Sequence, residues 1–214
     1  MEIYVDFHST ISESSAFELK DIVNKMLQEE INEEEERILH LLISSLGGNF
    51  YEGFSLYNFL KRKPIKINTY NMGCVDSIAI LLFCAGENRY SSSFCRFAFH
   101  PIKLRFDKLS EYELQRIKEE INITESDQLN IDELIAKTIG KNVSEVEKLV
   151  NLRKSILSEE ALKIGLLTEI NDKKIPNGAT VKTIYENEIS FKKHQSYYYH
   201  NPWVGNIRQA ISFG

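Results

Sequence analysis

The sequence predicts an α/β protein built around a largely parallel sheet. Short apolar or alternating runs typical of strands occur at 2–7, 38–44 and 65–70, and helical apolar patterns lie between them. Alternation of this kind implies crossover units, whose ligands gather at the carboxyl ends of the strands. With 214 residues, 43% of them hydrophobic, the chain is long enough to bury one sizeable core.

The first half of the chain supplies the strands expected at the centre of the sheet. Residues 2–7 alternate polar and apolar side chains, and 38–44 form a run typical of a buried strand. A helical pattern follows each of them. The next strand, at 65–70, precedes an apolar helix expected over 76–84, with Asp76 as its N-cap.

The second half begins with shorter elements. Short strands are expected at 88–91 and 96–100, and 102–106 alternates in the same way. Two helical apolar sets then occupy 114–121 and 131–139. We expect the helix to break at the polar stretch between these two sets.

Composition changes near residue 173. Residues 1–172 are interpreted as one domain, whereas 173–214 form an aromatic-rich C-terminal extension with its densest cluster at 197–203. Aromatic patches of this kind usually contact a partner. We therefore expect the extension to pack on the domain or on a neighbouring subunit.

Charge and composition argue against several function classes. The net charge is −5 and no basic stripe is interleaved with aromatic residues, so we expect no nucleic-acid partner. No apolar stretch approaches the ~20 residues of a membrane span, and the amino terminus lacks a signal-peptide pattern, which predicts a cytoplasmic protein without a membrane partner. Three cysteines without a CxxC pair support neither a disulfide framework nor a metal site, and we expect no metal and no cofactor.

Three short segments carry the residue types of a serine hydrolase. Gly47 and Gly48 form a turn after a buried run, where backbone N–H groups can face an oxyanion. Ser77 stands where a strand gives way to a helix, and His100 ends a β-rich run, so a nucleophile and a base are both present. Taken singly, each has an ordinary alternative, as a serine at a helix start or a hydrogen-bonded strand histidine. Cys74 is an alternative nucleophile, but it lies upstream of the expected helix.

Several motifs along roughly residues 1–170 resemble the proteolytic subunit of Clp protease. They are, in order, Ser45-Leu46-Gly47-Gly48, Gly73-x-x-x-Ser77, His100-Pro101, Ile139-Gly140 and Glu159-Glu160-Ala161-x-x-x-Gly165-Leu166. Each motif alone is weak, whereas their order and intervals together are fairly specific. The resemblance implies a crotonase-like α/β fold of stacked ββα units, a protruding handle helix near 110–139 that packs ring subunits together, and a chamber in which peptide bonds are cut.

Carried over residue by residue, the resemblance implies Ser77 as the nucleophile and His100 as the general base. It also implies that the backbone N–H groups of Gly48 and Ile78 form the oxyanion hole. The chemistry suits these places, because a serine hydroxyl needs a base to accept its proton. A tetrahedral oxyanion in turn needs preorganised donors, each worth about 3–4 kcal/mol in the transition state.

The sequence departs from the family pattern close to this site. Arg153 stands where the family carries the triad's carboxylate, and an arginine cannot orient an imidazolium. Asn151, two residues earlier, offers a carbonyl oxygen as a replacement acceptor. Asp76 replaces a small apolar residue beside the nucleophile, where its charge disfavours an oxyanion. His100 is followed directly by Pro101, so pairing with an extended substrate is expected to differ.

Three functional hypotheses follow. The first is a Clp-like serine endopeptidase that cuts peptides or unfolded proteins through an acyl-enzyme in a homo-oligomeric ring. A Clp-type ATPase is a doubtful partner. The family's axial loops help to dock that ATPase, and the chain begins at its first expected core strand, with no room for them. The second is a catalytically impaired ring or scaffold subunit. The third is a crotonase-type acyl-CoA enzyme, which would need proton-transfer groups where only Asp76 is recognisable.

Overall fold

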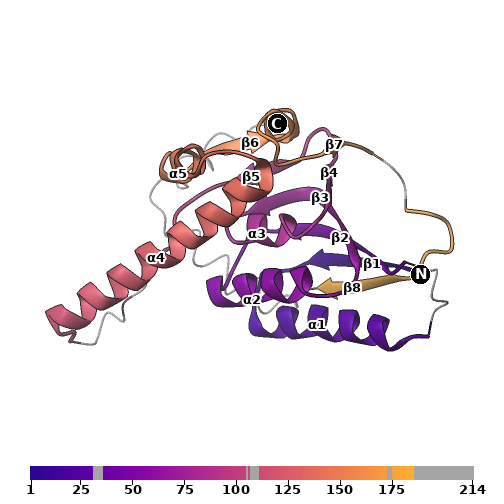
Figure 1. Cartoon of the computed structure of the whole chain (residues 1–214), viewed down its shortest axis with the longest axis horizontal. Helices are drawn as coiled ribbons and strands as arrows, with labels where there is room; N and C mark the ends of the chain where they lie inside the picture. The colour runs from indigo at the N-terminus through magenta and orange to yellow at the C-terminus, as the bar shows by residue number, and fades with distance from the viewer. Residues whose placement is uncertain (31–35, 105, 107–110, 173–174, 186–214) are drawn as a thin grey trace, which may run out of the picture. The chain divides into compact units, whose positions relative to one another are not determined.

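The structure is a computed structural model that describes residues 1–30, 36–104, 106, 111–172 and 175–185. Strands and helices alternate over the first half of the chain, as the sequence predicts (Figure 1). The elements are β1 (Glu2–His8), α1 (Glu13–Gln28), β2 (Ile38–Ser45), α2 (Phe50–Lys61), β3 (Lys66–Asp76), α3 (Ala79–Phe83), β4 (Asn88–Ser91), β5 (Arg96–Ala98), α4 (Leu114–Ile139), α5 (Val143–Asn151), β6 (Ser155–Leu157), α6 (Ser158–Lys163), β7 (Glu169–Ile170) and β8 (Val181–Tyr185).

The strands form one sheet in the order β6-β5-β3-β2-β1-β8, and β4 and β7 lie off this path. β1, β2 and β3 are parallel neighbours. β3 is long enough to serve two further parallel partners, because its first half pairs with β4 and its last residues pair with β5. The predicted, largely parallel sheet is therefore confirmed, with β6 joining β5 antiparallel. The end of β3 therefore lies between the end of β2 on one side and β5 on the other.

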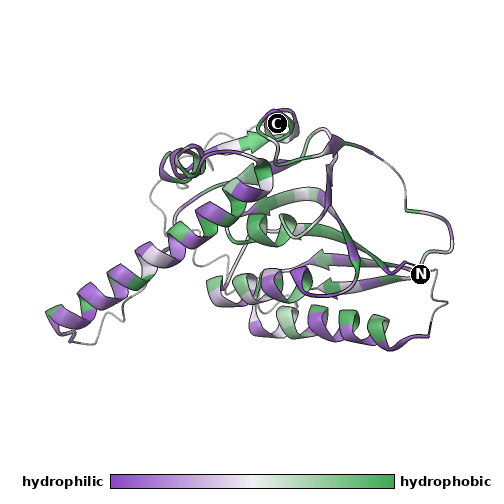
Figure 2. Cartoon of the chain, viewed as in Figure 1, coloured by the Kyte–Doolittle hydropathy of each residue, from purple (hydrophilic) through white to green (hydrophobic). Residues whose placement is uncertain are grey.

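The hydrophobic core lies between the sheet and the helices α1, α2 and α3. Phe7 and Ile43 are fully buried on the strands, and Leu19, Leu56 and Leu81 are fully buried on the three helices. In Figure 2, α3 is hydrophobic, whereas hydrophobic and hydrophilic residues alternate along α1 and α2. The strands whose ends carry the candidate site are thus anchored in this core.

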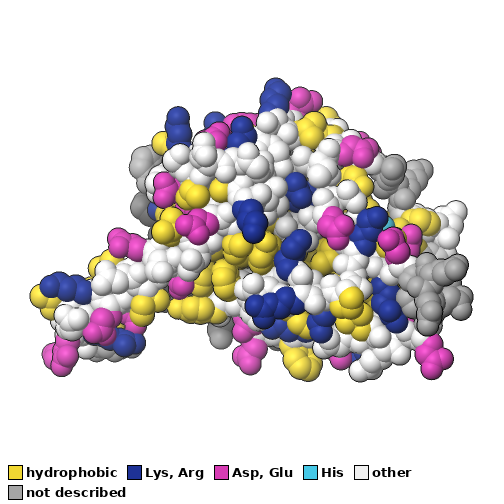
Figure 3. Space-filling model, viewed as in Figure 1, with side chains coloured by type: hydrophobic (Ala, Val, Ile, Leu, Met, Phe, Trp, Pro, Cys, Tyr) yellow, Lys and Arg dark blue, Asp and Glu magenta, His cyan; other side chains and the backbone are white. Residues whose placement is uncertain are grey.

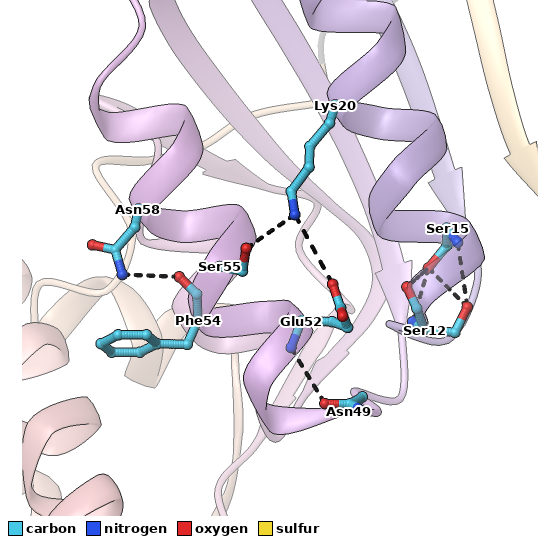
Figure 4. A network of polar contacts seen from close by, with 8 residues as sticks. All are labelled: Ser12, Ser15, Lys20, Asn49, Glu52, Phe54, Ser55 and Asn58. Atoms are coloured by element: carbon cyan, nitrogen blue, oxygen red, sulfur yellow. Dashed lines mark hydrogen bonds and ion pairs between the residues drawn. The ribbon is translucent and has the colours of Figure 1, made fainter.

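Polar contacts fix α2 relative to α1 (Figure 4). Lys20 of α1 donates to Ser55 Oγ at 2.9 Å and lies 4.0 Å from Glu52 on α2. Asn49 is the N-cap of α2, and its side-chain oxygen accepts from the Glu52 N–H at 3.3 Å. Because Asn49 directly follows Gly48, this cap also holds the glycine turn at the end of β2.

Helix α4 is continuous from Leu114 to Ile139, so the break expected between its apolar sets is wrong. The intervening polar stretch contains neither glycine nor proline, and Thr124 satisfies its hydroxyl on the Glu120 carbonyl at 2.7 Å. Only the carboxyl-terminal half of α4 is buried, through residues such as Ile131 and Ile135. The other half extends outward in Figure 1.

Two expectations around the site also need correction. The segment 102–106 forms no strand over its described residues, since the pairing of β5 ends at Ala98 and Pro101 lacks an N–H for a sheet ladder. The helix expected to begin at Asp76 begins at Ala79 instead. Asp76 is the last residue of β3 and does not cap the helix.

The predicted C-terminal extension is described only in part. Its strand β8 lies beside β1 at the edge of the sheet, and Tyr4 N–H donates to the Thr180 carbonyl at 3.2 Å. The aromatic cluster at 197–203 lies outside the described residues, so the division at residue 172 stays a prediction. In the part of the chain that can be described, no helix is both long and apolar enough to cross a membrane.

Candidate active site

Ser77 occupies a sharp turn between the end of β3 and α3. Its backbone φ is +58°, in the left-handed region that non-glycine residues seldom adopt. Its N–H donates to the Ala98 carbonyl at 2.8 Å, which ties the turn to β5. Ser77 therefore sits in a strained but firmly held conformation, and its own N–H is not free for an oxyanion.

The glycine turn after β2 closes on Ser77. Gly47 has φ +89°, and a Cβ built on it would lie 2.7 Å from Ser77 Cβ and 2.9 Å from the Asp76 carbonyl oxygen. Ile11 fixes the turn by donating to the Gly47 carbonyl at 2.8 Å and accepting from Asn49 N–H at 2.7 Å. Only glycine permits this approach of backbone to serine.

The two N–H groups predicted to form the oxyanion hole have no backbone or side-chain acceptor among the described residues. They belong to Gly48, in the glycine turn, and to Ile78, directly after Ser77. Unpaired N–H groups beside a serine suit the binding of an anion. Their assignment as the oxyanion hole stays a prediction.

His100 lies two residues beyond the end of β5. Its neighbour Phe99 donates to the Lys154 carbonyl at 2.8 Å, which ties this segment to the start of β6. His100 Nδ1 is 3.0 Å from the Pro101 carbonyl oxygen. Because a carbonyl can only accept, Nδ1 carries the proton and Nε2 presents a lone pair, the tautomer that a general base needs.

Several groups set the pKa of His100 below its usual value. Burial is the largest cause, because it disfavours the charged imidazolium, and the cations Lys103 and Arg153 lower the pKa further. The hydrogen bond to Pro101 and the charge of Asp76 act in the opposite direction. Near neutral pH the imidazole is therefore mostly unprotonated and able to accept a proton.

Comparison with known sequences assigns the chain to a family. The model of the Clp protease family matches residues 4–174, which include the glycine turn, Ser77 and His100. The chain belongs to the Clp protease family. It is also similar to the ATP-dependent Clp protease proteolytic subunit 2 of Borreliella burgdorferi, with 29% identity over 171 residues that cover 74% of this chain and 81% of the relative. The α/β architecture, a multi-stranded sheet with flanking helices, agrees with this family's fold, as predicted.

Ser77 and His100, the predicted nucleophile and base, follow the ends of the neighbouring strands β3 and β5 but are not hydrogen-bonded to each other. Ser77 is tied to Ala98, two residues before His100, while its Oγ has no hydrogen-bond partner among the described residues. Hydrogen bonds between a catalytic serine and histidine are often long or poorly aligned before substrate binds. The structure thus brings together the glycine turn, Ser77 and the strand that leads to His100.

Arg153, at the position where the sequence resemblance predicts the triad acid, is exposed. Arg153 lies in the turn after α5 with φ +50°, and its N–H donates to the Val150 carbonyl at 3.0 Å. Asn151, the predicted replacement acceptor, is the exposed last residue of α5 and makes no hydrogen bond to His100 among the described residues. The acceptor that does face His100 is the Pro101 carbonyl, which the sequence reasoning missed.

An ion pair beside Ser77 was also missed. Asp76 is 7% exposed and lies 2.5 Å from the Arg96 guanidinium. Burial raises the pKa of Asp76, while Arg96 and then His100 oppose the rise. Pairing of a longer β3 with β5 would have been the signal, because Asp76 pairs with Ala98 and Arg96 lies on the same face two residues earlier.

Cys74 is less suited to nucleophilic attack than Ser77. It is half-buried on β3, 3.9 Å from Ser44 Oγ. Burial is the main cause that raises the pKa of its thiol, with Asp76 adding to the rise, so little thiolate is present near neutral pH. Over the residues described, no group of three or more histidine, cysteine or acidic side chains could hold a metal ion.

Proposed function

We propose that this member of the Clp protease family is a serine endopeptidase that cuts peptide bonds through an acyl-enzyme at Ser77. The observation that carries the proposal is the backbone of Ser77, held at φ +58° between the Gly47 turn and the strand that leads to His100. Strained backbone that the surrounding structure fixes so tightly is typical of catalytic positions.

In the proposed reaction, Ser77 Oγ attacks the substrate carbonyl as His100 Nε2 takes the hydroxyl proton. The N–H groups of Gly48 and Ile78 then stabilise the tetrahedral oxyanion. His100 returns the proton to the leaving amine, and water repeats the sequence to release the acyl group. The Pro101 carbonyl keeps the proton on Nδ1 throughout, which supplies the tautomer control that a triad carboxylate otherwise provides.

Without a carboxylate, the imidazolium that forms during attack is less stable. Lys103 and Arg153 disfavour it, and Asp76 offsets them only in part. Loss of the acid in a Ser-His-Asp site costs about 10⁴ in turnover, mostly by admitting the wrong tautomer. Because Pro101 holds the right tautomer here, we expect a slow peptidase with a smaller loss.

The site is proposed to act inside an oligomer. The outer half of α4 carries apolar side chains that are unusually exposed, with Leu114 67% and Ile123 47% accessible. Hydrophobic side chains lie along α4 in the space-filling view (Figure 3). Exposed apolar residues on a helix that extends from the core suit subunit packing. Sedimentation of the full chain should show an assembly, and a stable monomer at micromolar concentration would contradict this part of the proposal.

A fluorophosphonate probe tests the peptidase proposal whichever peptide the protein cuts. The assembled full chain should form a covalent adduct that peptide mapping places on Ser77, and Ser77→Ala and His100→Ala should abolish it. Cys74→Ala is the control and should react like the wild type. An assembled wild-type protein that forms no adduct would overturn the proposal.

A catalytically retired subunit that serves as a ring or scaffold component is the second candidate. The exposed Arg153 at the acid position favours it, because this cation lowers the pKa of His100. This candidate predicts assembly without probe reaction. The acyl-CoA alternative receives less support, since Asp76, the acid expected to transfer protons, is buried and paired with Arg96.

A further inference from the structure

One peptide group connects His100 to helix α4. The carbonyl that accepts from His100 Nδ1 belongs to Pro101, and the N–H of the same peptide unit belongs to Ile102. That N–H donates to Gln128 Oε1 of α4 at 2.8 Å. A trans peptide is rigid and planar, with its C=O and N–H pointing in opposite directions, so fixing the N–H also fixes the direction of the carbonyl.

The orientation of the Gln128 amide is fixed in turn by Asp132. The Ile102 N–H can only donate, so it must meet the amide oxygen, and the amide nitrogen then needs an acceptor. Asp132 Oδ1 provides it at 2.9 Å, one helical turn further along α4. Asp132 is only 2% exposed. Burying its carboxylate costs free energy that an apolar side chain at the same position would not cost.

We propose that Gln128 and Asp132 are positioning residues that hold the Pro101–Ile102 peptide in the orientation required to keep His100 in its active tautomer. This inference rests on the proposed function, since it assigns to α4 the task that the missing acid performs in a triad. The hydrogen bond from Ile102 to Gln128 also polarises the peptide, which strengthens its carbonyl as an acceptor for Nδ1.

The electrostatics of Asp132 are consistent with this role. Burial raises the pKa of Asp132 to about 6, the hydrogen bond from Gln128 opposes the rise, and Glu147 on α5 adds to it. Near pH 7 the carboxylate is therefore mainly ionised. An ionised carboxylate only accepts hydrogen bonds, as the Gln128 amide nitrogen requires.

A reciprocal exchange of the pair tests the inference. In Gln128→Glu, the new carboxylate faces Asp132 across 2.9 Å, and at a pH high enough to ionise both carboxylates the repulsion should pull it away from Ile102. Probe reaction at Ser77 should then fall about tenfold to a hundredfold, part of the ~10⁴ that loss of tautomer control costs. The double variant Gln128→Glu with Asp132→Asn should recover most of the rate, because the new carboxylate can accept from both Ile102 and the new amide.

The same helix offers a matched control. Gln115 Nε2 donates to Glu119 Oε1 at 3.3 Å, again one turn along α4, but on the exposed half. Gln115→Glu introduces the same charge next to the same kind of neighbour and should leave probe reaction unchanged. An equal loss in Gln115→Glu would attribute the effect to the charge of α4 rather than to Ile102.

Two NMR measurements decide the inference even if a variant fails to fold or the wild type is inactive. In the wild type, ¹⁵N shifts of the His100 ring should show the Nδ1–H tautomer, and the Ile102 amide should be protected from hydrogen exchange. A wild-type His100 with its proton on Nε2, or an unprotected Ile102 amide, would overturn the inference. So would a Gln128→Glu protein that folds and keeps both the wild-type tautomer and the wild-type rate. Absence of probe reaction in the wild type would instead overturn the proposed function.

Discussion

The proposed nucleophile and the proposed base are supported by different kinds of structure. Ser77 follows β3, which pairs with a strand on each side and has the fully buried Val75 next to its end. His100 lies beyond the end of β5, and the segment after it pairs with no strand over residues 101–104. Its anchors are the Lys154 carbonyl near β6 and the Gln128 side chain on α4.

This difference shows which part of the site depends on the core and which part depends on the periphery. The geometry of the nucleophile comes with the fold, because the same backbone contacts build the sheet. The geometry of the base depends on a few hydrogen bonds from elements at the side of the sheet. Changes near Ser77 should therefore affect stability and reactivity together, whereas changes near His100 should affect reactivity alone.

The largest effect is expected from Gly47→Ala. The new Cβ would lie 2.7 Å from Ser77 Cβ, at a backbone φ of +89° that alanine disfavours. We expect a loss of about 2–4 kcal/mol in the free energy of unfolding, within the range of backbone strain and overpacking. Probe reaction at Ser77 should fall at least about a hundredfold, because each 1.4 kcal/mol of lost positioning is tenfold.

Gly178→Ala separates the effect of contact from that of backbone strain. Gly178 has a similar φ of +83°, but no atom lies within 4 Å of a Cβ built there. Denaturant unfolding and probe kinetics on the two variants should show a small stability loss and wild-type reactivity for Gly178→Ala. Equal reactivity in both variants would show that the glycine turn does not shape the nucleophile.

The next effect is expected from Arg96→Ala, which leaves the buried Asp76 carboxylate without its cation. Removing one partner of a buried pair costs about 3–5 kcal/mol, and we expect about 2–3 because the Arg96 side chain is itself half-exposed. Arg116→Ala, which breaks an exposed pair with Glu120, is the control and should cost at most about 1 kcal/mol.

The destabilisation by Arg96→Ala should depend on pH in a defined direction. The pKa of Asp76 is already raised in the folded protein, and loss of Arg96 raises it further. The folded state then binds a proton that the unfolded state has lost, so the free energy of unfolding rises as pH falls from the raised pKa toward about 4. A stability loss that stays constant over this range would show that the charge of Asp76 is not the cause.

The smallest effect is expected on the base side, from Arg153→Asp. This change removes a cation that lowers the pKa of His100 and adds an anion that favours the imidazolium. Aspartate also tolerates the φ of +50° better than arginine. We expect probe reaction to rise about tenfold while the free energy of unfolding changes by less than about 0.5 kcal/mol, as for a surface change.

Arg153→Gln is the comparison for this variant, since it removes the cation without adding an acid. Its rate should lie between those of the wild type and Arg153→Asp. An unchanged rate for Arg153→Asp would mean that this position takes no part in setting the charge of His100, and a fall in rate would contradict the predicted direction.

The sheet and the order of the site residues were predictable because both follow local patterns. Alternation and apolar runs set β1, β2 and β3, and paired glycines mark a turn whatever surrounds them. The continuity of α4 was not predicted, because polar residues permit an exposed helix without signalling one. The strand expected at 102–106 had the right pattern, but Pro101 prevents regular pairing at its start.

The remaining features of the site depend on contacts between distant residues. Asp76 was interpreted as a helix cap, whereas the end of β3 places it beside Arg96, twenty positions further along the chain. The acceptor of His100 is a backbone carbonyl, and any residue carries one, so no side chain in the sequence points to it. Its support by Gln128 depends on where α4 packs, which the sequence pattern does not determine.

The central claim is that Ser77 reacts with His100 as its base although no carboxylate orients the imidazole. The pH dependence of fluorophosphonate labelling in the wild type tests it most directly. The account predicts an adduct on Ser77 whose rate of formation rises with pH to a plateau, with a midpoint below the usual histidine value of 6.5, because burial lowers the pKa of His100. An adduct on Cys74, a rate unaffected by His100→Ala, or no adduct at any pH would contradict it.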